Sequence, residues 1–497
     1  MTKQKTTHRV QIVNSNSMKS CFKKVTLFFW ALFAIQLQAQ TPVSGGIYQS
    51  TSWTRSNSPY IMTGPVVVFP GATLTIEPGT KVLVRETGNG TSVGTNYLEV
   101  RGTLQMIGQP NLPIQLEGET QKQRRDGWYG LKIMRSQGAV LRADYFHLAN
   151  AYYGFFVDNG VLPDSSVFHQ CVWKTNGYAY TAFNKSIFDS CVFQNNMVGL
   201  SGNLLPTSTP WISVNNSSFI SNSVAVNPYG SHAVVQNSSF SNNDMAISGI
   251  GSIEVNQDSF FNNRIGIRGV QGKVEQSVFF NNNYGIIDAS GLHIKNIALQ
   301  GSNLAFDLGE NCILEWSTVA NNDTAIQISG NLTFGSTYPS IKQNKICNNS
   351  QYHVVNGSNL NLNMARNCFC EPDSAAIDAK LYDGYDDITR GLFNFSVFDT
   401  SCTTVLDVVE KVYIAGTQLA TQDLQWKASI FPNPGNDQFS VRSNLPVTRL
   451  IVRNLQGQTV GEFQNRDSVL TESWPNGIYL IEIQSGKNRD LLRWVKK

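Results

Sequence analysis

Charged residues are scarce in this sequence. Asp, Glu, Lys and Arg together make up 15% of its 497 residues, and the formal net charge is +3. Residues 1–40 hold six of the basic residues and no acidic one, so the rest of the chain carries 32 basic and 35 acidic residues, or −3. No basic patch of the kind that binds nucleic acids is present, which argues against that class of function.

Several short catalytic motifs are also missing. The sequence has no Ser-His-Asp order with a nucleophile elbow, no His-Glu-x-x-His and no phosphate-binding loop. Segments with helical periodicity are absent from the central part of the chain. The missing motifs give no local signature of catalysis, and the missing helical periodicity favours strands in the central part.

Long apolar runs are absent except near the N-terminus. Three lysines precede that run, namely Lys19, Lys23 and Lys24. The apolar run itself covers Val25–Ile35 and is followed by a small residue, Ala39. This pattern predicts a secretory signal peptide over residues 1–40, with Met18 as the better start. The alternative, a membrane anchor, is disfavoured because the run is too short to span a bilayer.

The chain does contain a repeat of about twenty residues. Its anchor residues are Phe219, Phe240, Phe260, Phe279, Leu299 and Val319. Their spacings are 21, 20, 19, 20 and 20 residues. A fixed period in this range is typical of a solenoid.

The pattern inside one repeat indicates the kind of solenoid. Ile253 and Val255 alternate with Glu254, Phe260 follows a turn, and a second alternating segment ends at Ile267. Each repeat therefore holds three short strands, and Asn residues between them suit sharp corners. Stacked coils of this kind form a parallel β-helix, with strands about 4.8 Å apart.

Two apolar columns should line the interior of this β-helix. The first is aromatic and contains Trp173, Phe193, Phe219, Phe240, Phe260 and Phe279. The second lies five positions earlier in each coil and contains Phe168, Phe188, Val214, Val235, Val255, Val274, Ile294 and Leu314. Neighbouring coils are needed to bury such columns. We expect regular coils over residues 144–366, with insertions around 160–163, 202–210 and 334–339.

Residues 41–143 are less regular and are predicted to form the N-terminal cap and first coils. The segments Ser58–Ile61, Pro70–Gly79, Gly102–Leu104 and Gly127–Gly130 resemble the opening of secreted bacterial right-handed β-helix proteins with a pectate-lyase-like fold. Residues 367–399 resemble the last coil and cap of that family. The resemblance there is partial, because Phe369-Cys370 stands where Trp-Gly is usual. A short helix over Ser374–Leu381 is expected to cover the end.

The C-terminal part is a separate module after a linker at 400–428. It contains Phe431-Pro-Asn-Pro434, Gly457-Gln-Thr-Val460, Asn476-Gly-Ile-Tyr-Leu480 and a basic end. In this order the motifs closely resemble the C-terminal sorting domain of type IX secretion cargo, so residues 429–497 are expected to form a small β-sandwich. The resemblance implies that the type IX secretion machinery is a partner. It also implies a location outside the cell or on the outer surface of a Gram-negative bacterium.

The chain has eight cysteines, and Cys21 lies within the predicted signal peptide, before the apolar run. Seven cysteines therefore remain after removal of the signal peptide. Cys171 and Cys191 occupy equivalent positions of adjacent coils, so they either form a disulfide or fill the column as small apolar residues. The second interpretation is favoured. Cys368-Phe-Cys370 lacks the second cysteine pair that a zinc site needs.

Candidate catalytic residues are those that stacking would bring together. Asp144, His169 and Asp189 stand four positions before consecutive anchors, and predict either a site of three ionisable groups or a polar corner. A second set consists of Arg264 and Arg268 with the acids Asp244 and Asp288. It predicts either a catalytic site or a charged face exposed to solvent. In both sets the structural interpretation is favoured.

A third set consists of three acidic residues in the expected C-terminal cap. Asp383, Asp386 and Asp387 could hold Ca²⁺, because carboxylates suit hard cations, or form a polar cap, which is favoured since no strict ligand spacing is present.

Two functions follow. The preferred one is a secreted or surface-displayed β-helix protein that binds or adheres, with a glycan as a candidate ligand, and has no enzymatic activity. It is favoured by the sparse charge and the lack of a convergent site. The alternative is a polysaccharide lyase or glycoside hydrolase, which rests on analogy with other β-helix proteins. No short motif tests it, because active sites on β-helices have no local signature.

Overall fold

The computed structural model describes residues 40–497 except 121–123, 159–164, 182–184, 203–210, 333–334, 400–401, 403–427, 432, 444–446, 465, 467 and 486–487. The predicted signal peptide, most of the linker and most residues of the first two expected insertions lie outside the described residues. In the described part, no helix is both long enough and apolar enough to cross a membrane.

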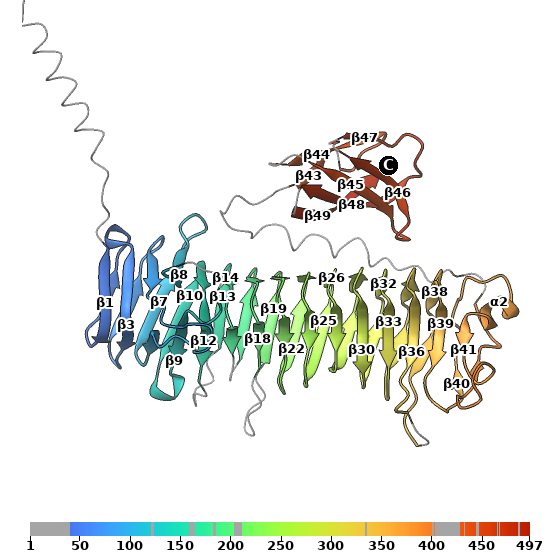
Figure 1. Ribbon diagram of the computed structural model, residues 1–497, viewed down its shortest axis with the longest axis horizontal. Coiled ribbons are helices and arrows are strands. Elements are labelled where there is room, and N and C mark those ends of the chain that lie inside the picture. Colours follow the sequence, from blue (N-terminus) through green and yellow to red (C-terminus); the bar gives the residue numbers. More distant parts are fainter. Residues whose placement is uncertain are drawn as a thin grey trace, which may run out of the picture.

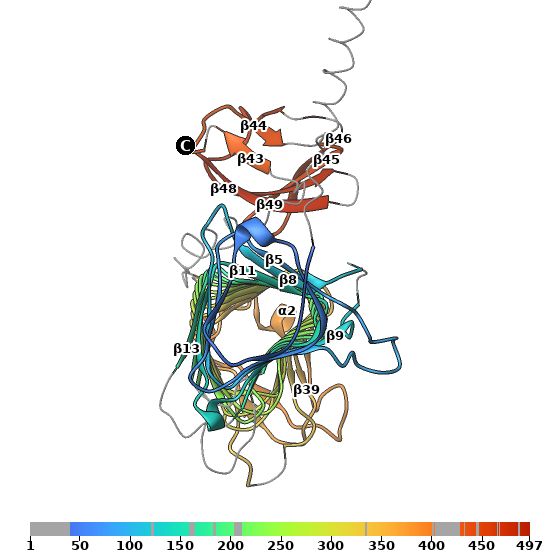
Figure 2. The same cartoon turned by 90° about the vertical axis from the view of Figure 1, so that its left-hand side faces the viewer.

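From Thr41 onward the chain winds into a parallel β-helix with three sheets along its length, confirming the predicted fold (Figure 1). We number the three sheets 1 to 3. Two long strands at the start, β1 (Thr41–Ile47) and β3 (Tyr60–Val68), pair with each other and run through both sheet 1 and sheet 2. Seen end-on, the coils enclose a single interior (Figure 2).

Sheet 1 contains β5 (Lys81–Val84), β8 (Ile114–Gly118), β11 (Phe146–Ala149), β14 (Val172–Lys174), β17 (Val192–Gln194), β20 (Ser218–Ile220), β23 (Ser239–Ser241), β26 (Ser259–Phe261), β29 (Val278–Phe280), β32 (Ala298–Gln300), β35 (Thr318–Ala320) and β38 (Lys345–Cys347). Sheet 2 contains β6 (Tyr97–Val100), β9 (Trp128–Ile133), β12 (Ala151–Val157), β15 (Tyr178–Thr181), β18 (Val198–Ser201), β21 (Val224–Asn227), β24 (Met245–Ser248), β27 (Ile265–Arg268), β30 (Tyr284–Ala289), β33 (Leu304–Leu308), β36 (Thr324–Ile328), β39 (Tyr352–Asn356) and β41 (Leu381–Tyr382).

Sheet 3 has two parts. The first contains β2 (Thr51–Trp53), β4 (Thr73–Ile76), β7 (Thr103–Ile107) and β10 (Val140–Asp144). The second contains β13 (Ser166–His169), β16 (Ser186–Asp189), β19 (Trp211–Asn215), β22 (His232–Gln236), β25 (Ser252–Asn256), β28 (Gln271–Glu275), β31 (Leu292–Lys295), β34 (Ile313–Glu315) and β37 (Ser340–Lys342). Two short 3-10 helices, η1 (Arg55–Asn57) and η2 (Arg135–Gln137), lie between early strands.

The predicted aromatic column forms the centre of the core. Phe260 is fully buried, and its ring lies parallel to those of Phe240 and Phe279, with centroid distances of 4.8 and 4.3 Å. Parallel stacking follows from strand pairing, because equivalent residues of adjacent coils repeat at the strand spacing. The second predicted column, represented by Val235 and Val255, is also buried.

The Asn pairs of the repeat have two different roles. The first Asn of a pair, such as Asn242, is exposed and adopts a left-handed backbone with φ of 57°, as expected for a corner. The second, such as Asn243, is buried. Its Nδ2 donates to Oδ1 of Asn263 at 2.9 Å, and its Oδ1 accepts from Nδ2 of Asn222 at 3.0 Å.

This buried asparagine ladder is a second role of the Asn pairs, beside the predicted corner geometry. It runs through Asn176, Asn196, Asn222, Asn243, Asn263 and Asn282. Each side chain also donates to a backbone carbonyl of the preceding coil, so buried corner groups are satisfied without water.

A second turn column confirms that Cys171 and Cys191 are fillers. Both thiols are free and buried, and in the following coils their position is taken by Ser217 and Ser238. Asp258 then interrupts the serines. Its buried carboxylate accepts the backbone N–H groups of Ser238 at 2.6 Å and of Asn256 at 3.0 Å. Burial raises the pKa of Asp258 well above its usual value, while these two hydrogen bonds oppose the shift.

Replacing Asp258 with Ser should therefore stabilise the protein at neutral and alkaline pH. A carboxyl whose pKa is raised in the folded state stabilises below its unfolded pKa of about 3.9 and loses that contribution as pH rises. Asp258→Ser should raise the unfolding free energy at pH 8 by about 1–3 kcal/mol, and much less near pH 4. Urea denaturation at both pH values measures this. Ser238→Asp, which adds a second buried acid, should have the opposite sign; a gain from Asp258→Ser that is equal at both pH values would contradict the explanation.

The C-terminal end of the solenoid is closed by a small cap. The expected helix is present as α2 (Ser374–Asp378), with Asp373 accepting the N–H of Ala376 at its N-terminus. The strands β40 (Leu362–Asn363) and β42 (Phe393–Asn394) pair nearby, and Phe393 and Ile377 join the core.

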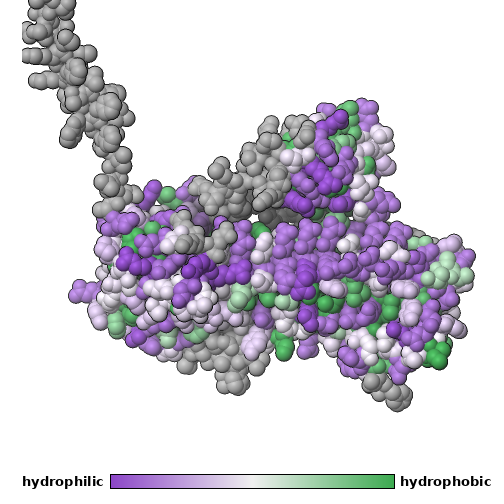
Figure 3. All heavy atoms as spheres, viewed as in Figure 1, coloured by the Kyte–Doolittle hydropathy of each residue, from purple (hydrophilic) through white to green (hydrophobic). Residues whose placement is uncertain are grey.

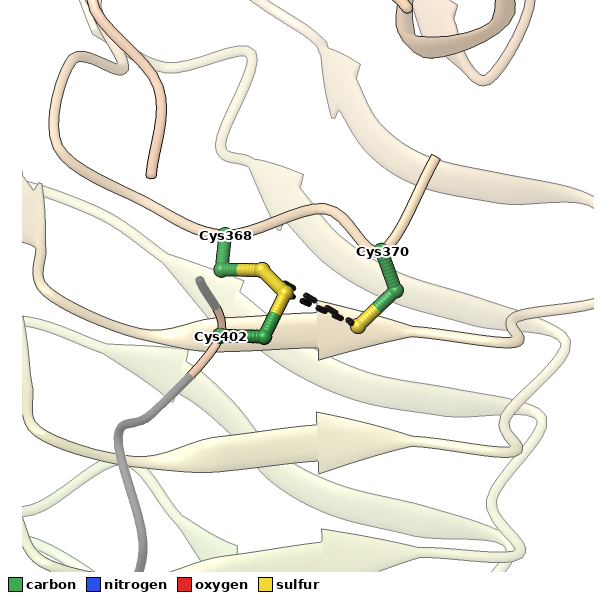
Figure 4. Close-up of side chains that lie close together, drawn as sticks. All are labelled: Cys368, Cys370 and Cys402. Atoms are coloured by element: carbon green, nitrogen blue, oxygen red, sulfur yellow. Dashed lines mark hydrogen bonds between the residues drawn. A yellow bond between two sulfur atoms is a disulfide. The ribbon is translucent and has the colours of Figure 1, made fainter. Parts of the chain in front are cut away.

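Two disulfides hold this cap, which the sequence did not predict. Cys368 pairs with Cys402 and Cys370 pairs with Cys347, at sequence separations of 34 and 23 residues. The sulfur atoms lie together, with 3.4 Å between those of Cys370 and Cys402 (Figure 4). Since each of these sulfurs is bonded to another, the cluster is a covalent clamp on the last coil.

The C-terminal module is a sandwich of two antiparallel sheets, as predicted. One contains β43 (Ala428–Phe431), β44 (Gln438–Ser443) and β47 (Ser468–Leu470); the other contains β46 (Thr459–Gln464), β45 (Arg449–Asn454), β48 (Gly477–Ser485) and β49 (Asn488–Lys496). The motif residue Asn433 binds the last strand, donating to the carbonyl of Arg493 and accepting from the N–H of Val495. The motifs thus hold the terminal strand in place.

Candidate functional site

Asp144, His169 and Asp189 are brought together on adjacent coils, at the ends of β10, β13 and β16. The backbone N–H of His169 donates to Asp144 at 2.9 Å, and His169 Nε2 lies 3.6 Å from Asp189 Oδ2. Burial raises the pKa of Asp144, while the hydrogen bond and the charge of His169 lower it. Asp189 also accepts from Nδ2 of Asn216 at 3.0 Å. These side chains therefore serve the corner itself.

Arg264 and Arg268 each form a separate ion pair with an acid on the neighbouring coil. Arg264 binds Asp244, and Arg268 Nε lies 2.7 Å from Asp288 Oδ2. All four side chains are about half exposed. Exposed ion pairs of this kind contribute little to stability. Arg268 and Asp288 belong to strands of sheet 2, whereas Asp144 belongs to sheet 3, so the two predicted sets of candidate residues do not converge on one site.

Asp383, Asp386 and Asp387 bind protein groups of the cap. Asp383 accepts the N–H groups of Tyr385 and Phe393, at 2.9 and 2.8 Å, and Asp386 accepts the N–H of Asp383. Hydrogen bonds from Thr389 and Arg390 lower the pKa of Asp387 to about 2. These hydrogen bonds give the three carboxylates a structural role in the cap, and the Ca²⁺ site stays a prediction.

A row of tyrosines on the outer face of sheet 2 was not predicted from the sequence. Its members are Tyr97, Tyr129, Tyr153 and Tyr178, one on each of β6, β9, β12 and β15. Successive ring centroids lie 6.4, 5.5 and 5.4 Å apart. All four rings are partly exposed. We call these four residues the tyrosine row.

Backbone geometry explains how the row forms. Gly130 has φ of 121°, and a Cβ there would lie 1.5 Å from the carbonyl oxygen of Tyr153. Only glycine permits β9 and β12 to approach this closely, which places Tyr129 beside Tyr153. Tyr152 and Phe156 flank the row, with rings 4.7 and 5.5 Å from that of Tyr153. Burial raises the pKa of Tyr153, as do the neighbouring tyrosines, so the phenol stays neutral.

A hollow of about 250 Å³ lies farther along the solenoid, after β30 and β33. Its lining includes the carboxylates of Asp288, Asp307 and Glu310. Burial raises the pKa of Asp307 and the adjacent Asp288 raises it further, while one buried oxygen of Asp307 has no hydrogen-bond partner among the described residues. One of these acids, Asp288, is held by Arg268. On the side of the solenoid seen in Figure 3, hydrophilic residues gather along the upper part, and neutral and hydrophobic residues are frequent below it.

Comparison with known proteins identifies the C-terminal module. Residues 429–497 match the secretion system C-terminal sorting domain family. No curated protein matches the chain. Among solved structures, the crystal structure of bacteriophage CBA120 tailspike protein 3 is similar over 72% of the chain, with 10% identity and a TM-score of 0.26. The chain spans 55% of the length of that tailspike chain.

The sorting domain determines where the protein acts. It marks the chain for export by the type IX secretion system, to the cell surface or the extracellular space. Interaction with that secretion machinery follows from the same domain. The β-helix is therefore the part of an exported protein that is available for a function outside the cell.

Proposed function

We propose that this exported β-helix binds a polysaccharide without cleaving it, and that the tyrosine row is the binding surface. The observation that supports this most directly is the alignment of four partly exposed tyrosines along the solenoid axis. Sugar rings present apolar C–H groups beside hydroxyls, and tyrosine offers a ring and a hydroxyl to match them. A linear row on consecutive coils suits an extended polymer.

Alanine substitutions in the row test the proposal. Tyr153→Ala and Tyr178→Ala should each weaken binding to the polysaccharide by about 2 kcal/mol, or roughly thirtyfold, as for aromatic residues at the centre of an interface. The exported chain is screened against immobilised polysaccharides, and affinity is measured by titration calorimetry for the one retained. Release of reducing ends or unsaturated uronates is followed in parallel.

Tyr284→Ala is the matched control. Tyr284 lies on β30 in the same outward register as Tyr178 but stands between Ile265 and Leu304, away from the row. Its substitution should leave affinity within about twofold. Equal losses for Tyr284→Ala and Tyr153→Ala, or no retention of any polysaccharide, would refute the proposed site.

The carboxylate hollow favours a second candidate function, glycoside hydrolysis. A carboxyl with a raised pKa beside an ionised carboxylate is the pair that this reaction uses. In that case Asp307 acts as the acid and Asp288 as the base, and Asp307→Asn abolishes the release of reducing ends. If a polysaccharide in the screen is retained but none is cleaved, the non-catalytic function stands.

A further inference from the structure

The tyrosine row has basic neighbours without acidic partners. Lys132, on β9, places its ammonium 4.0 Å from the ring centroid of Tyr97 and 4.2 Å from that of Tyr129. Among the described residues it forms no ion pair. The carboxylate closest in register, Glu99, is bound by Arg101 at 2.6 Å and is almost buried. Lys132 is therefore a positive charge held in a fixed place within the row.

Arg125 supplies a second positive charge. A Cβ built on Gly177, the residue before Tyr178, would lie 3.3 Å from the backbone carbonyl oxygen of Arg125 and 3.2 Å from Cδ2 of Tyr152. Its guanidinium donates to the carbonyl of Asn195 at 3.1 Å, which leaves other N–H groups available. No described carboxylate pairs with it, whereas the neighbouring Arg124 is paired with Asp126 at 3.2 Å.

We infer that the tyrosine row selects an anionic polysaccharide, whose carboxylate or sulfate groups bind Lys132 and Arg125 while its sugar rings pack on the tyrosines. This inference rests on the proposed function and names the class of ligand. The remainder of the exported chain does not favour such a ligand, because residues 41–497 carry 32 basic and 35 acidic residues. Preference for an anion must then come from the local site.

Three polymers with one backbone test the inference: dextran, carboxymethyl-dextran and dextran sulfate. The full exported chain should bind one of the charged polymers at least about tenfold more tightly than dextran at low salt, and lose that preference at high salt. Comparison of the two charged polymers distinguishes a carboxylate from a sulfate ligand. Lys132→Met, which keeps the apolar stem, should reduce the preference about fivefold or more.

Lys273→Met is the matched control, since it removes one positive charge from β28 on sheet 3. It should leave the preference unchanged if the site is local. Equal binding to all three polymers, or equal effects of Lys132→Met and Lys273→Met, would overturn the inference. If dextran still binds and Tyr153→Ala still weakens that binding, the proposed function survives. Loss of all polysaccharide binding in the screen refutes both.

Discussion

Phe260→Ala is expected to lower the unfolding free energy by about 3–5 kcal/mol, as for other buried aromatic residues. The ring is fully buried between Phe240 and Phe279, and the rigid backbone of adjacent coils prevents collapse of the space it leaves. Each coil contacts only its neighbours, so one cavity weakens two inter-coil interfaces. Urea denaturation followed by intrinsic fluorescence measures the loss.

The adjacent residue provides the control for this experiment. Phe261 is only partly buried and lies on the other face of the strand, so Phe261→Ala should cost about 1 kcal/mol or less. If Phe260→Ala and Phe261→Ala lowered the unfolding free energy by the same amount, the aromatic column would not form the core in solution.

Asn243→Ala should have a comparably large effect for a different reason. The substitution leaves the backbone N–H and Nδ2 of Asn222 and the carbonyl of Phe219 without their partners. Each buried group left unsatisfied costs about 1–3 kcal/mol, so the expected loss is several kcal/mol. Thermal and urea denaturation measure it.

Asn242→Ala separates this role from corner geometry. Asn242 is exposed with a left-handed backbone, so Ala costs about 1–2 kcal/mol there, and Gly should restore the loss. At position 243 Gly cannot restore it, because the missing groups are hydrogen-bonding atoms. Rescue of the 243 variant by Gly would show that the ladder contributes nothing.

The candidate site was much harder to predict than the fold. The row tyrosines are separated by 32, 24 and 25 residues, which obscures any period. Insertions between early coils cause this irregularity, and only strand register restores the alignment. The sequence did bring Asp144, His169 and Asp189 together correctly, because each stands four positions before the anchor residue of its coil.

The disulfides show the same limit. Cys347, Cys368, Cys370 and Cys402 meet because the last coil and the chain beyond it return to one place, and no local pattern encodes that return. From sequence spacing, Cys368 and Cys370 were recognised only as a pair that lacks the second cysteine pair of a zinc site.

By itself the sequence determined the β-helix, its buried aromatic column and the sorting domain. It could do so because a repeated local pattern is imposed again in every coil, and motif residues lie close together in the chain. Tertiary structure alone decided which Asn of each pair is buried, how the cap cysteines pair and where the tyrosines align. These features depend on contacts between coils, and their residues are set apart by loops of unequal length.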